Sequence, residues 1–255
     1  MKIKSADAVF SELYNMQYKF NVYNGKPCDE VAQIYKKIIE NVPIIQLHNQ
    51  YLYRARTIDK ERDVNVRKGI YLINNRLYGG FNEKESGIAP KEKCAPGRLN
   101  RQGEQVLYLA EDRNTTLCEM RAKTGEMISV AQFFAAEPIK VIDFSRYKKE
   151  EYEDLFSDEI ISFFSKEYGC SVYQTYLDIQ KYLTMPDFRK DNYIISNSLI
   201  DAFRSMPALG IKYISYYTGK ANIALWNLKN EIQFINSGIY RFDEDIIVNK
   251  GAQEE

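Results

Sequence analysis

The sequence has few of the residues on which most catalytic centres depend. It contains one histidine, His48, and four cysteines in 255 residues. Because the cysteines show no CxxC pairing, a zinc site would have to be assembled from scattered cysteines and carboxylates. A Ser-His-Asp or Cys-His mechanism could use only His48, which we interpret as a structural residue. No metal is therefore expected, and a histidine-based nucleophilic mechanism is disfavoured.

The chain also lacks a net charge and a long apolar run. Lys+Arg and Asp+Glu number 35 each, so no global charge attracts the protein to nucleic acid or to an anionic membrane. No segment approaches the roughly 20 apolar residues that span a bilayer. The N-terminal MKIKSADAVFSELYN has no signal-peptide apolar region, and the cysteines are too sparse for a disulfide framework. These absences predict a cytoplasmic protein with reduced thiols, without a membrane partner and with nucleic acid disfavoured as a partner.

Aromatic residues, in contrast, are abundant. The chain has 20 tyrosines and 13 phenylalanines. Such residues pack cores and interfaces, and they also stack on flat rings of ligands. Composition leaves both interpretations open.

Hydrophobic periodicity predicts an α+β chain with helices at the start and in the middle. A helix is expected over 31–42, charged helices with aromatic stripes over about 146–190, and another helix over 193–203. Short strands are expected at QVLYLA, MISVAQFFAA, PIKVIDFS, GIKYISYY, ANIALWNL and EIQFI. In QVLYLA, Val106 and Tyr108 should share one face and Leu107 and Leu109 the other. We predict a helical extension over 1–45, a core domain over 46–240 with the helical insert inside it, and a tail over 241–255.

The stretch GRLNRQGEQVLYLAEDRNTTLCE joins a glycine-flanked loop, a buried strand and a helix. Its three unusual residues are Arg98 at the loop, Tyr108 in the strand and Glu119, which we place in the first turns of the helix. Asp112, Asn114, Thr115 or Thr116 can cap the start of that helix, and Gly125 is expected to close it. Taken alone, Thr116 to Glu119 reads as a capping box, in which the glutamate would be bound to its own helix start. A solvated arginine and a core tyrosine are the corresponding structural interpretations of the other two residues.

These residues, together with YRAR, YIISN and GIKYISYYTGKANIALW, resemble the RES-domain family. The resemblance covers about 47–228 and leaves the first 45 residues outside. It implies an ADP-ribosyltransferase-like fold with a split β-sheet core and flanking helices. Members of the family include toxins of RES–Xre toxin–antitoxin pairs, which deplete NAD or modify a protein target. An antitoxin protein is therefore an implied partner, and a homo-oligomer stays open.

The resemblance also implies the roles of individual residues. It gives Glu119, Arg98 and Tyr108 as catalytic residues, and Arg54 as a second arginine that binds NAD together with Arg98 and Tyr108. Ser215 is the preferred candidate for the family serine and Ser196 the second candidate, both as residues that bind NAD. The hydroxyl of Ser215 is expected to orient the carboxylate or the nicotinamide amide by a hydrogen bond. The family has a Thr-Gln pair where this chain has Ser196 and Asn197, and the insert is longer than in small members. Of the two arginines in YRAR we expect only Arg54 to face the pocket.

The chemistry of NAD explains why such residues are suitable. Arginine forks bind pyrophosphate oxygens, and an aromatic face favours the cationic nicotinamide ring. Cleavage of the nicotinamide–ribose bond passes through an oxocarbenium-like centre that a carboxylate stabilises, and nicotinamide leaves as a neutral ring without a general acid. We therefore expect NAD as a substrate for a glycohydrolase or phosphorylase. The alternatives are a mono-ADP-ribosyltransferase and a non-catalytic interaction module.

Overall fold

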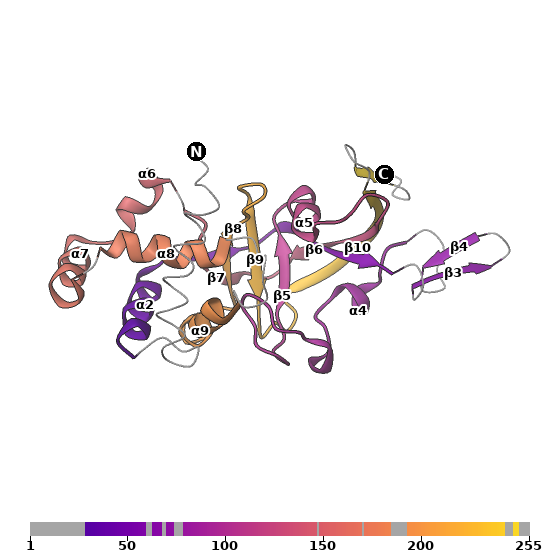
Figure 1. Ribbon diagram of the computed structural model, residues 1–255. Coiled ribbons are helices and arrows are strands. Elements are labelled where there is room, and N and C mark those ends of the chain that lie inside the picture. The colour runs from indigo at the N-terminus through magenta and orange to yellow at the C-terminus, as the bar shows by residue number, and fades with distance from the viewer. Residues whose placement is uncertain are drawn as a thin grey trace.

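The architecture is that of a large mixed sheet with helices gathered over one part of it (Figure 1). The computed structural model describes residues 29–59, 63–67, 70–73, 79–146, 148–169, 171–184, 193–242 and 247–249. Nine of the described strands form one sheet in the order β1-β7-β8-β9-β5-β2-β6-β10-β11. Their bounds are β1 Ile44–Leu47, β2 Gln50–Ile58, β5 Leu107–Ala110, β6 Met127–Ala135, β7 Ile139–Phe144, β8 Gly210–Ile214, β9 Ala221–Leu225, β10 Ile232–Phe242 and β11 Ile247–Asn249. A separate hairpin of β3 Val64–Arg67 and β4 Ile70–Ile73 projects at the right of Figure 1.

The sheet is split into two halves at the junction of β5 and β2. These two strands share a single residue pair, Tyr53 with Ala110, whereas β2 and β6 pair along all nine residues of each strand. One half consists of β1, β7, β8, β9 and β5, and the other of β2, β6, β10 and β11. The predicted α+β class with a split sheet and flanking helices is confirmed.

Alternating side chains give the first half two buried faces, as the strand period of two requires. In β5, Leu107 and Leu109 enter a core that also contains Leu52 and Phe133 of the other half, so the two halves pack against each other. Tyr108 packs against the opposite core, in which Val106 is buried. The predicted division of faces in this strand is confirmed.

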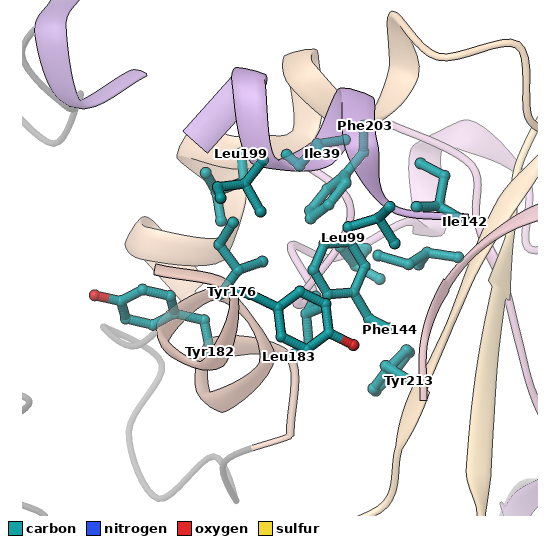
Figure 2. Packing of buried hydrophobic residues seen from close by; sticks show 14 of the residues in the cluster. Ile39, Leu99, Ile142, Phe144, Tyr176, Tyr182, Leu183, Leu199, Phe203 and Tyr213 are labelled. Atoms are coloured by element: carbon teal, nitrogen blue, oxygen red, sulfur yellow. The ribbon is translucent and has the colours of Figure 1, made fainter. Parts of the chain in front are cut away.

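The opposite core lies between the first half of the sheet and the helices (Figure 2). Helices α2 Asp29–Asn41, α8 Val172–Thr184 and α9 Tyr193–Arg204 contribute to it, and α2 packs against both of the others. Phe144 lies at its centre, stacked on Tyr176 with ring centroids 5.3 Å apart and edge-on to Phe203 at 5.8 Å. Figure 2 shows these three side chains pointing toward one another from a strand and two helices.

The helical insert is built of short pieces before α8. They are α6 Lys149–Tyr152, η2 Glu153–Leu155, α7 Asp158–Phe163 and η3 Phe164–Tyr168. Its aromatic stripe is largely core, since Phe156, Phe164, Tyr176 and Tyr182 are buried, while Phe163 is exposed.

The two ends of the chain lie partly outside the described residues. Of the predicted N-terminal extension, residues 1–28 are not described, and α2 buries Ile38 and Ile39 in the core next to α8 and α9. In the predicted tail, β10 continues to Phe242 and β11 pairs with its end. In the part of the chain that the structure describes, no helix is both long and apolar enough to cross a membrane.

Candidate functional site

A pocket of about 370 Å³ opens on the first half of the sheet, beside the end of α8. It is lined by Gly97, Arg98, Tyr108, Glu119, Arg121, Thr184, Tyr213 and Asn222. The loop, strand and helix residues singled out in the sequence, Arg98, Tyr108 and Glu119, therefore meet in one place. Among the described residues no group of three histidine, cysteine, aspartate or glutamate side chains is placed to bind a metal ion.

Glu119 reaches the pocket from the last turn of α5, which spans Arg113–Met120. The N-cap is Asp112, whose carboxylate accepts hydrogen bonds from the backbone N–H and the hydroxyl of Thr115 at 2.8 and 2.7 Å. The capping-box interpretation of Glu119 is therefore wrong, and so is its placement in the first turns. Because the N-cap is Asp112, four residues before Thr116, Glu119 lies near the opposite end of the helix. The expected closure at Gly125 is also wrong, since Arg121 is the C-cap.

Two side chains from neighbouring strands hold the Glu119 carboxylate. The Ser215 hydroxyl donates to Oε1 at 2.6 Å from the end of β8, and the Asn222 amide donates to the same oxygen at 2.7 Å from β9. Ser215 and Asn222 are buried, whereas Glu119 itself is exposed. Short charge-assisted bonds of this kind fix the orientation of a carboxylate. Both anchors therefore act on the same oxygen, Oε1.

Tyr108 fixes the loop that carries the arginine. Its hydroxyl accepts a hydrogen bond from the backbone N–H of Leu99 at 2.8 Å and donates to the Asn100 side chain at 2.9 Å. A Cβ at Gly97 would lie 2.4 Å from the Asn100 oxygen, so the close turn requires glycine there. The tyrosine thus contributes a pocket wall and positions the residues around Arg98.

Arg98 lines the pocket and also reaches the C-terminal end of α8. Its guanidinium donates to the carbonyl of Leu183 and lies 3.5 Å from that of Tyr182. Helix C-terminal carbonyls lack helical partners and carry partial negative charge, so a cation is stabilised there. Arg98 therefore ties the helical insert to the pocket, a contact that sequence spacing gives no means of predicting.

Arg54 does not line the pocket. Its guanidinium donates to the backbone carbonyls of Ser86 and Gly87, and Arg56 donates to that of Glu85 in the same short helix, α4 Glu83–Ser86. The expectation that the two arginines face different ways is wrong, because residues two apart on a strand share a face. Burial lowers the pKa of Arg54 to about 10, and the charge of Arg56 lowers it as well. Arg54 therefore holds the backbone at the end of α4, and its contact with NAD stays a prediction.

The structure also locates the second serine candidate and two pocket residues that were not predicted from the sequence. Ser196 lies in α9, but its side chain is outside the described residues. Asn222 and Arg121 were not anticipated. Asn222 could have been predicted from the sequence, because an asparagine inside the apolar run ANIALW must be hydrogen-bonded if it is buried. Arg121 could not have been predicted from the sequence, because its place in the pocket depends on where α5 ends.

Comparisons with known proteins identify a family for most of the chain. A family model described as RES domain matches residues 70–240. A comparison with curated proteins finds no match. Among solved structures, a chain in the crystal structure of the M. tuberculosis MbcT–MbcA toxin–antitoxin complex is similar with a TM-score of 0.42 and 10% sequence identity, over 80% of this chain and 90% of that chain. The family model includes every residue that lines the pocket.

Proposed function

The chain belongs to the RES domain family, and from this membership and the pocket we propose that it is an NAD-consuming enzyme that cleaves the nicotinamide–ribose bond. The observation that supports the reaction best is the carboxylate of Glu119, held in a pocket by Ser215 and Asn222 and flanked by Arg98 and Tyr108. A carboxylate fixed in this way is suited to stabilising positive charge that develops on a ribose.

The protein needs only to bind NAD and to stabilise the positive charge that develops on the ribose. The bond between C1′ of the ribose and the nicotinamide nitrogen breaks, and the leaving ring takes the electron pair and becomes neutral. An oxygen of water or of phosphate forms the new bond to C1′, and its proton passes to solvent. Glu119 would face the reacting ribose carbon, where charge builds up as in glycoside cleavage. The aromatic ring of Tyr108 would form a wall for the cationic ring.

Incubation of the purified protein with NAD tests the proposal. We expect release of free nicotinamide and formation of ADP-ribose in water, or of a phosphorylated product if phosphate is the acceptor. Chromatography of the products with and without phosphate measures both. If the wild-type protein releases no nicotinamide under either condition and in the presence of cell extract, the proposed function is wrong.

Transfer to a macromolecule is the second candidate, and the exposure of Glu119 favours it because a bulky acceptor could approach the reacting carbon. NAD labelled on the adenine side would then mark a protein or nucleic acid in the extract. Action as a toxin, with an antitoxin protein as partner, is a further proposal that follows from the family. Growth arrest on expression of the wild-type protein tests it. A purely non-catalytic module would arrest growth equally well without the Glu119 carboxylate.

Ser215 gives a sharper test of how the carboxylate is positioned. We expect Ser215→Ala to lower kcat for NAD cleavage by about 10- to 100-fold, because it removes a hydrogen bond to a charged group. KM should change little, because the Ser215 hydroxyl already donates to Glu119. Ser215→Thr keeps the hydroxyl and should recover part of the rate. Steady-state kinetics of the three proteins would contradict this role if alanine and threonine behaved alike.

A further inference from the structure

Arg121 has a backbone conformation that favours glycine. It follows the last turn of α5 with φ 48° and ψ 41°, in the left-handed region, and its N–H donates to the carbonyl of Cys118. Glycine is the usual residue at this position after a helix, because a Cβ is strained there. A long charged side chain at such a position points to a role for the side chain.

The surroundings of that side chain connect it to the carboxylate of the site. Arg121 is exposed and lines the same pocket as Glu119. Its guanidinium carbon lies 5.6 Å from the centre of the Tyr217 ring, within the range of a cation–π contact. The N–H of Tyr217 donates to the Ser215 hydroxyl, which in turn donates to Glu119. The loop that contains Ser215 and Tyr217 therefore contacts both the arginine and the carboxylate.

The charge of the pocket suits a dinucleotide with one anionic bridge. Two arginines and one carboxylate line it. Of the arginines, Arg98 is engaged with the carbonyl of Leu183, and Arg54, which the sequence offered as the partner cation, lies outside the lining. Arg98 is half-buried, whereas Arg121 lines the same pocket from an exposed position two residues after Glu119 in the chain.

The size of the pocket supports the same conclusion. Its volume of about 370 Å³ is at the low end of small-molecule sites. A dinucleotide whose nicotinamide ribose faces Glu119 must therefore extend beyond the pocket. Arg121, which lines the pocket, and the Tyr217 ring beside it are both exposed. Resting on the proposed function, we propose that Arg121 binds the pyrophosphate of NAD, with the Tyr217 ring holding its guanidinium in place, and so selects dinucleotides over shorter nicotinamide compounds.

The left-handed backbone allows a clean test. Arg121→Gly removes the side chain without strain, so its melting temperature should equal or exceed that of the wild type. We expect KM for NAD to rise by about 10- to 100-fold, the effect of losing a hydrogen bond to a charged group, with a smaller change in kcat. Cleavage of nicotinamide riboside, which has no pyrophosphate, should be unchanged. The control is Arg113→Ala. Arg113 is the exposed first residue of α5 and lies over the rings of Tyr53 and Tyr240, but it does not line the pocket.

Binding of ADP-ribose, measured by calorimetry, separates this inference from the proposed function. If the wild type cleaves NAD and Arg121→Gly has the same KM, the inference is overturned while the function stands. If Arg121→Gly loses NAD and nicotinamide riboside equally, the arginine does not read the pyrophosphate. If the wild type cleaves neither compound, the function fails, and weaker ADP-ribose binding by Arg121→Gly alone would support the inference, whereas equal binding would overturn it.

Discussion

Glu119→Gln should lower kcat for nicotinamide release by at least about 10²- to 10³-fold, the effect of removing one preorganised electrostatic contact to a charged transition state. The substitution is close to isosteric, and the structure makes it unusually specific. Ser215 and Asn222 both donate to Oε1, so the amide oxygen of glutamine can accept both bonds. The variant therefore loses the negative charge while the anchors of the side chain remain.

Two further variants distinguish charge from position. Glu119→Asp keeps the charge but is one methylene shorter, so it should lose the bonds to Ser215 or Asn222 and also be slow. Glu92→Gln, at an exposed position on η1 Lys91–Lys93, is the matched control and should be as active as the wild type. A fully active Glu119→Gln enzyme, measured by nicotinamide release in single-turnover and steady-state assays, would exclude the carboxylate from the reaction.

Phe144→Ala should destabilise the protein by about 3–5 kcal/mol, as expected for removing a fully buried aromatic side chain. Phe144 is 0% exposed and contacts rings of both the insert and α9, so the cavity would open where sheet and helices meet. Urea unfolding followed by circular dichroism measures the change. Should the alanine variant fail to fold, Phe144→Leu would show a smaller loss in the same direction.

Phe163→Ala is the matched control for that experiment. It lies in the same insert, is 37% exposed and packs edge-on against Phe164 and Tyr168. The loss of unfolding free energy should stay well below that of Phe144→Ala, because less of the apolar area of Phe163 is buried in the folded protein. Equal losses from the two substitutions would show that the insert and the sheet do not share one cooperative core.

The strands were predictable because their apolar runs are short and end at turn residues, and the faces of β5 followed from simple alternation. The bounds of α5 were not predictable, since Asp112, Asn114, Thr115 and Thr116 are all competent caps. Because the start of the helix was uncertain, Glu119 was predicted at the wrong end of α5, and Arg121 was not predicted to line the pocket. Contacts between residues that are distant in sequence were not predictable either. The hydrogen bond between Arg98 and the end of α8, for example, joins residues 85 apart.

The meeting of Arg98, Tyr108 and Glu119 was expected from the family resemblance rather than from spacing. A loop, a strand and a helix that follow one another can converge only if the intervening turns bring them back. The structure shows the turns that do so, at Gly97 and at the Asp112 cap. The partners of the carboxylate come from β8 and β9, about a hundred residues later, where local pattern carries no such information.

The strand order also sets when the site can form during synthesis. The carboxylate anchors lie on β8 and β9, and the other half of the sheet uses β10 as the partner of β6. A nascent chain that has emerged only as far as α5 has Glu119 but neither Ser215 nor Asn222. Because these pairings join residues that are distant in sequence, they form late and slowly. A ribosome-bound fragment that ends before residue 210 therefore lacks the assembled pocket, and a cell making this protein meets the complete site only after almost all of the described chain has been translated.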